Sequence, residues 1–62
     1  MQKRITYTHL TKGHEVVIKA RIAEDKYNNP ASDKLIVWSY THDNFMDIEK
    51  HTILNIEDWK DD

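Results

Sequence analysis

The stretch that decides the fold is Lys34-Leu35-Ile36-Val37-Trp38-Ser39-Tyr40, a short run of mostly large or β-branched residues. Alternate residues of an extended strand point to opposite faces of a sheet, and here both sets are largely apolar. One set is Leu35, Val37 and Ser39, and the other is Ile36, Trp38 and Tyr40. A strand of this kind is typical of the centre of a sheet. The run therefore predicts a central strand whose second face is covered by the rest of a small barrel or by a partner.

A second strand with one polar face is predicted for residues 15–23. Its apolar positions are Val16, Ile18, Ala20 and Ile22, and they alternate with Glu15, Val17, Lys19 and Arg21. This alternation predicts one face on a core and one in water. Residues 4–10 form a further strand, with Ile5 and Tyr7 on its core face. Residues 11–14 hold the only glycine, Gly13, which suits the positive φ of a tight turn, so we expect an antiparallel hairpin.

The chain beyond the central strand allows two interpretations. Residues 24–33 form a polar loop, and residues 41–44 form a turn. In the first interpretation residues 45–48 and 52–58 are two short strands. In the second, Asn44 caps a helix with an apolar stripe along one face. The β-branched run at residues 52–56 and the acidic chain end, which opposes a helix dipole, favour the strands.

Five strands in this order predict an all-β protein with a small SH3-like or Sm-like barrel. The alternative is a three-stranded antiparallel sheet with a C-terminal helix, βββα. The spacing of the strand residues along the chain is set by Ile5-Thr6-Tyr7, Lys12-Gly13, Ile22, residues 45–48 and residues 53–57. It resembles the strand spacing of WYL-type and YolD-like bacterial modules. This resemblance implies an architecture and carries over no binding residue, because fold alone does not give function.

Size and charge limit the classes of function. A chain of 62 residues forms one domain, 1–62, with residues 60–62 as a frayed tail. There is no cysteine, which excludes disulfides and thiolate chemistry and fits a reducing compartment. The net charge is −2, from 9 basic and 11 acidic residues, unlike the basic footprint of a typical nucleic-acid binder. No apolar segment follows the first four residues or approaches membrane-spanning length, so we predict a cytoplasmic protein without a membrane partner.

Metal binding and catalysis receive little support from the motifs. The four histidines are His9, His14, His42 and His51, and no pair has the compact spacing of a zinc motif. His9 and His14 flank the predicted turn and can face each other across the hairpin. The carboxylates lack a recognisable nucleophile–base motif or phosphate-binding loop beside them. We therefore predict no metal, no cofactor and no enzymatic activity.

Binding is the remaining class of function. The aromatic residues Tyr7, Trp38 and Phe45 are predicted to lie in the core, whereas Tyr27 stands in a polar loop where no core pattern explains it. The candidate binding residues are Tyr27, Lys19, Arg21 and Tyr40. The leading interpretation is a bacterial or phage accessory protein that binds another protein or a second copy of itself. The second is a small barrel that binds single-stranded RNA or DNA through the same residues.

Overall fold

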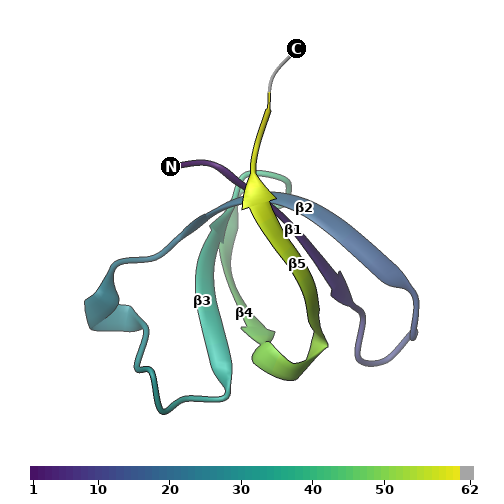
Figure 1. Ribbon diagram of the computed structural model, residues 1–62, viewed down its shortest axis with the longest axis horizontal. Coiled ribbons are helices and arrows are strands. Elements are labelled where there is room, and N and C mark those ends of the chain that lie inside the picture. Colours follow the sequence, from purple (N-terminus) through teal and green to yellow (C-terminus); the bar gives the residue numbers. More distant parts are fainter. Residues whose placement is uncertain (61–62) are drawn as a thin grey trace.

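The computed structural model describes residues 1–60, which form one five-stranded antiparallel sheet with the order β4-β3-β2-β1-β5 (Figure 1). The strands are β1 (Lys3–Thr8), β2 (Glu15–Ile22), β3 (Lys34–Ser39), β4 (Asn44–Glu49) and β5 (Ile53–Asp58). Two 3₁₀ turns lie between strands, η1 (Asp25–Tyr27) in the β2–β3 connection and η2 (Lys50–Thr52) between β4 and β5. The all-β prediction is confirmed. Within residues 1–60, β4 and β5 are the two edge strands. No ladder joins them, so the structure shows a five-stranded sheet and not a closed barrel.

The C-terminal helix of the alternative interpretation is wrong. The chain instead reverses through η2, where the Thr52 hydroxyl donates a hydrogen bond of 2.7 Å to the Glu49 carbonyl. The Lys50 amide donates to the Asp33 carbonyl at 2.7 Å, which ties η2 to the loop before β3. Thr52 therefore belongs to the turn and not to the last strand, where the sequence had placed it. The β-branched residues that follow adopt the extended conformation that they favour.

Strand β2 belongs to both halves of the sheet. Its residues from Glu15 to Ala20 pair with β1, and its residues from Ala20 to Ile22 pair with β3. Ala20 is the shared residue, and its partners are Lys3 on one side and Ser39 on the other. The sheet bends where β2 passes from one partner strand to the other, and Ala20 is fully buried at this point. Figure 1 shows the result, with β2 running from the β1–β2 hairpin across the molecule to β3.

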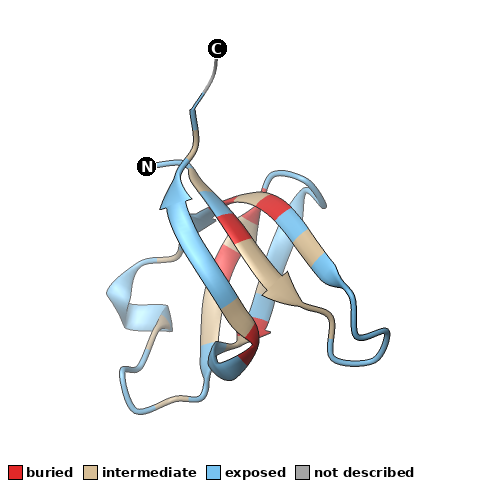
Figure 2. Cartoon of the chain, turned by 45° about the vertical axis from the view of Figure 1, so that its right-hand side comes forward, coloured by how far each residue is buried: buried red, intermediate tan, exposed pale blue. Residues whose placement is uncertain are grey.

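The bend wraps the sheet around one small core. Its buried apolar residues come from four strands and are Ile5, Ile18, Ala20, Val37 and Ile48 (red in Figure 2, with buried Ser39 and Thr52). Partly buried residues pack against them, namely Tyr7, Val16, Leu35, Met46 and Ile53. These positions confirm the predicted core faces of β1 and β2, and in β3 they place the core on the side of Leu35 and Val37, opposite Trp38, which was predicted to lie in the core. Ile22 is the exception at 40% exposed, because it ends β2 beyond the bend.

Each of the two hairpin turns contains one residue with a positive φ angle. Gly13 has φ of 74°, as its place in the β1–β2 turn predicts. In the β3–β4 turn Asp43 takes φ of 53°, a conformation that aspartate tolerates better than most residues. The buried Ser39 hydroxyl accepts a hydrogen bond of 3.1 Å from the His42 amide and so satisfies a polar atom next to the core.

Candidate functional site

The side of β2, β3 and β4 opposite the core, here called the outer face, carries the aromatic side chains that the core does not use. Trp38 and Phe45 are directly opposite each other in the β3–β4 ladder. Their rings make an edge-to-face contact, with centroids 4.9 Å apart and planes at 79°. Phe45 is nevertheless 55% exposed and Trp38 is only partly buried. The prediction that Phe45 lies in the core is therefore wrong, because its ladder partner places it on the outer face.

Lys19 and Tyr40, two of the predicted binding residues, lie together on the outer face. The Tyr40 amide donates to the Lys19 carbonyl at 2.8 Å, and the Lys19 amide donates to the Thr41 hydroxyl oxygen at 3.0 Å. The Lys19 ammonium lies 5.9 Å from the centroid of the Tyr40 ring and 5.2 Å from that of Trp59. Sequence reasoning missed Trp59, which follows β5 and extends its ladder, because the Trp59 amide donates a hydrogen bond of 3.0 Å to the Gln2 carbonyl.

Arg21 and Tyr27, the other two predicted residues, line one hollow at the far end of β2. This hollow, here called the Arg21 hollow, has a volume of about 310 Å³. Its lining residues are Met1, Arg21, Ile22, Ala23, Glu24, Tyr27 and Phe45. Tyr27 and Phe45 come from the β2–β3 loop and from β4, and each is more than half exposed. Among residues 1–60 the Arg21 guanidinium has no carboxylate partner, whereas Glu24 forms an ion pair of 3.6 Å with Lys26.

The loop that carries Tyr27 is fixed by the next residue, Asn28. The Asn28 amide group donates to the carbonyls of Ala23 at 3.1 Å and Ile36 at 3.0 Å, and its oxygen accepts from the Ile36 amide at 2.7 Å. Asn28 therefore completes the hydrogen bonding of β3 where β2 has ended. Two backbone hydrogen bonds close η1: the Tyr27 amide donates to the Glu24 carbonyl, and the Asn28 amide donates to the Asp25 carbonyl. The exposed Tyr27 ring therefore belongs to a turn whose backbone is held by hydrogen bonds.

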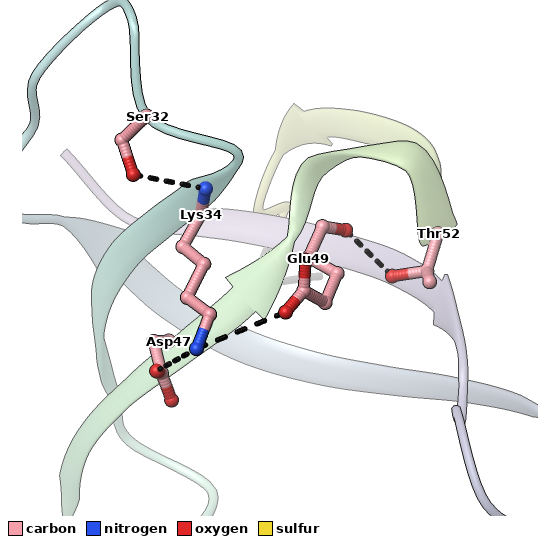
Figure 3. A network of polar contacts seen from close by, with 5 residues as sticks. All are labelled: Ser32, Lys34, Asp47, Glu49 and Thr52. Carbon is pink, nitrogen blue, oxygen red and sulfur yellow. Dashed lines mark hydrogen bonds and ion pairs between the residues drawn. The ribbon is translucent and has the colours of Figure 1, made fainter.

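Two other hollows differ from the Arg21 hollow in their charges. One, of about 300 Å³, lies between the end of β1 and the β3–β4 hairpin. There the Lys34 ammonium lies 3.4 Å from the Asp47 carboxylate and 3.8 Å from the Glu49 carboxylate (Figure 3). Its lysine and two carboxylates therefore already pair with one another, and they offer no unpaired cation to a ligand.

The other hollow, of about 350 Å³, lies beside the end of β5. Here Arg4 pairs with Glu57 at 3.7 Å, and Lys3 pairs with Asp58 at 2.5 Å. The hydrogen bond and positive charge of Lys3 hold the pKa of Asp58 below its usual value. A lowered pKa is opposite to what a general acid needs at neutral pH.

The histidines at the β1–β2 turn do face each other, as predicted, with ring centroids 5.7 Å apart and planes at 12°. The His9 Nδ1 atom accepts hydrogen bonds from the amides of Thr11 at 3.2 Å and Lys12 at 3.1 Å. A metal bond lies in the plane of an imidazole ring, and two nearly parallel stacked rings do not converge on one ion. The described part of the chain also holds no group of three or more metal-ligating side chains.

No family model, no curated protein and no solved structure matches this chain. Within residues 1–60 no helix is long and apolar enough to cross a membrane.

Proposed function

We propose that this protein is a non-enzymatic interaction module that binds another protein through its outer face. The observation that carries the proposal is the exposed Phe45 ring, which packs edge-to-face on Trp38 and lines one hollow with Arg21, a cation that has no carboxylate partner among residues 1–60. Phe45 is 55% exposed and lies outside the core. Aromatic side chains and arginine are also the residues that most often dominate the free energy of binding in protein interfaces.

A foreign partner suits the outer face better than a second copy of this chain. In a two-fold symmetric dimer the same patch meets itself, which brings two copies of the cations Lys19 and Arg21 into one interface. Like charges brought together in an interface oppose binding. The aliphatic residue Val17, which is exposed on the outer face of β2, suits apolar contacts with a protein.

Single-stranded nucleic acid is the second candidate ligand. It is favoured by the Lys19 ammonium between the Tyr40 and Trp59 rings, since cations that alternate with aromatic rings suit phosphates and stacked bases. Phosphate contacts supply most non-specific affinity, and only Lys19 and Arg21 on this face lack a carboxylate partner in the described chain. Titration with a fluorescent dT12 oligonucleotide at low salt tests this candidate, and saturable, salt-sensitive binding would favour it over a protein partner.

Selection of peptides from a random library displayed on phage tests the proposed function. We expect selected peptides to bind saturably and to shift the backbone NMR signals of β2, β3 and β4. Phe45→Ser should weaken binding, while the matched control Leu10→Ser, at an exposed apolar residue of the β1–β2 turn, should not. Peptides that bind equally to both variants, or a library that yields no saturable binder, would contradict the proposal.

Light scattering across a dilution series tests the remaining alternative, self-association. A monomer supports a foreign partner, whereas a stable dimer whose mass falls to that of a monomer in Phe45→Ser would place a second copy on the outer face.

Three finer features belong to the same proposal. Closure of the sheet into an SH3-like or Sm-like barrel is supported by the single core and by η2 between β4 and β5. A cytoplasmic location is supported by the absence of cysteine. A role as a bacterial or phage accessory protein fits a small domain without a catalytic motif.

A further inference from the structure

The charges around the three hollows indicate where a partner contributes a charge of its own. In the other two hollows Lys34 and Arg4 pair with carboxylates of this chain, and the further cation there, Lys60, belongs to the end of the described chain rather than to the sheet. In the Arg21 hollow the guanidinium has no carboxylate partner within residues 1–60, and the nearby Glu24 is paired with Lys26. A guanidinium next to apolar walls binds a carboxylate in a charge-assisted, bidentate manner.

The walls of the hollow suit a large apolar side chain. Tyr27 and Phe45 line it together with the aliphatic Ile22, and all three are exposed in the free protein. A volume of about 310 Å³ is at the lower limit for small-molecule pockets and suits one bulky side chain. Burial of such a side chain between two aromatic rings stabilises a complex by removing apolar surface from water on both partners.

The hollow is also formed before any partner binds. The three hydrogen bonds of the Asn28 side chain and the closed η1 turn hold the backbone of Tyr27 in place. On the other side, Phe45 is held against Trp38. A binding site that is already ordered loses less conformational entropy when it is occupied.

From these three observations we infer that the Arg21 hollow binds a protein segment in which an acidic residue stands next to a large aromatic or aliphatic residue. The apolar side chain enters between Tyr27 and Phe45, and the neighbouring carboxylate pairs with Arg21. Asn28 is a positioning residue, because it acts through Tyr27. This inference rests on the proposed function and specifies the partner's chemistry.

NMR titration with matched synthetic peptides tests the inference. The probes are the acetylated, amidated tetrapeptides Gly-Glu-Trp-Gly, Gly-Lys-Trp-Gly and Gly-Glu-Ala-Gly. We expect the Glu-Trp peptide to shift the backbone signals of Arg21, Ile22, Tyr27 and Phe45. The other two peptides should bind about tenfold more weakly, because each lacks one of the two contacts.

Charge reversal makes the test specific. Arg21→Glu should bind the Lys-Trp peptide more tightly than the Glu-Trp peptide, while Lys12→Glu, the same change in the distant β1–β2 turn, should keep the wild-type preference. Arg21→Gln, which removes the charge without reversing it, should bind both peptides alike and guards against a folding defect in the reversed variant. Tyr27→Ala should weaken all Trp peptides.

Three results would overturn the inference: no binding of any peptide, equal binding of the Glu-Trp and Lys-Trp peptides, or signal shifts outside the hollow. None of these would by itself remove the proposed function, since peptides selected from the random library can still bind elsewhere on the outer face. Conversely, failure of the library selection together with the tetrapeptides would remove both.

Discussion

Two neighbouring residues of β2 show how the two faces of this sheet differ. Ile18 is 1% exposed and lies among core residues from three other strands, while Val17 is 45% exposed on the outer face. Both are β-branched and both pair with β1. Both side chains therefore favour a strand, but only that of Ile18 contributes apolar surface to the core. The core accounts for Ile18, whereas Val17 adds apolar surface to the outer face, which we propose binds another protein.

Alanine substitution at these two positions gives the largest expected contrast. Ile18→Ala leaves a cavity in the core and should lower the free energy of unfolding by about 2–5 kcal/mol. A domain of this size has only about 3–5 kcal/mol in total, so the variant should be largely unfolded. Val17→Ala should cost less than about 1 kcal/mol. Urea denaturation followed by tryptophan fluorescence measures both, and equal losses would contradict the distinction between the faces.

The next contrast concerns Asn28, whose hydrogen bonds hold the loop that carries Tyr27. Asn28→Ala removes three hydrogen bonds and leaves the partly buried Ile36 amide without its acceptor, which should cost about 1–3 kcal/mol. It should also speed amide hydrogen exchange at Ile36 and Tyr27. Asn29→Ala is the matched control, because its single bond to the Ala31 amide lies at the surface. If both variants exchange alike, Asn28 does not order the Arg21 hollow.

A third substitution tests the turn that sets the register of both faces. Gly13 has φ of 74°, and nothing lies within 4 Å of a Cβ atom added there. Gly13→Ala therefore meets no steric contact and should cost only the backbone strain of a positive φ, about 1–2 kcal/mol. Lys12→Ala in the same turn should be close to neutral. A loss for Gly13→Ala as large as that for Ile18→Ala would mean that the register itself had changed.

The sequence predicts the inner face of the sheet better than the outer face, for a physical reason. Burial imposes an alternation that can be recognised in one strand, and it placed Ile5 and Ile18 correctly. Two features come from pairing between strands and are less visible along the chain. One is the position of Phe45 opposite Trp38, which follows from a four-residue turn between the two strands. The other is Trp59, which reaches Lys19 only because β5 pairs with β1.

The candidate binding residues show the same limit. Polarity and loop context selected Tyr27, Lys19, Arg21 and Tyr40, and the structure brings them together as two pairs. Lys19 with Tyr40 forms one pair, and Arg21 with Tyr27 lines the hollow. The sequence does not reveal which cations are already neutralised. That depends on which carboxylates the sheet places opposite them, as with Lys34 between Asp47 and Glu49.

The smallest expected effect compares two ion pairs at adjacent positions of the β1–β5 ladder. Lys3 and Asp58 are opposite each other on the core side, and Arg4 and Glu57 on the outer side. The first pair is shorter, at 2.5 Å against 3.7 Å, and its lysine is less exposed. Both pairs reach the surface, so each contributes little, but the Lys3 hydrogen bond and charge lower the pKa of Asp58 from 3.8.

The sign of the pH dependence follows from that shift. Because the folded pKa of Asp58 lies below the unfolded value, the unfolded chain binds the proton more readily, and the stabilisation is present above about pH 4. It is lost as the pH falls through 3.8 toward the lower, folded value. The urea midpoint of Asp58→Asn should therefore lie slightly below that of the wild type at pH 6, and the gap should close by pH 2.5. Glu57→Gln should show a smaller gap at pH 6, because its ion pair is longer and more exposed. A gap for Asp58→Asn that stays constant over this range would show that the Lys3 contact does not hold in solution, and the core side of the ladder would then have no stronger ion pair than the outer side.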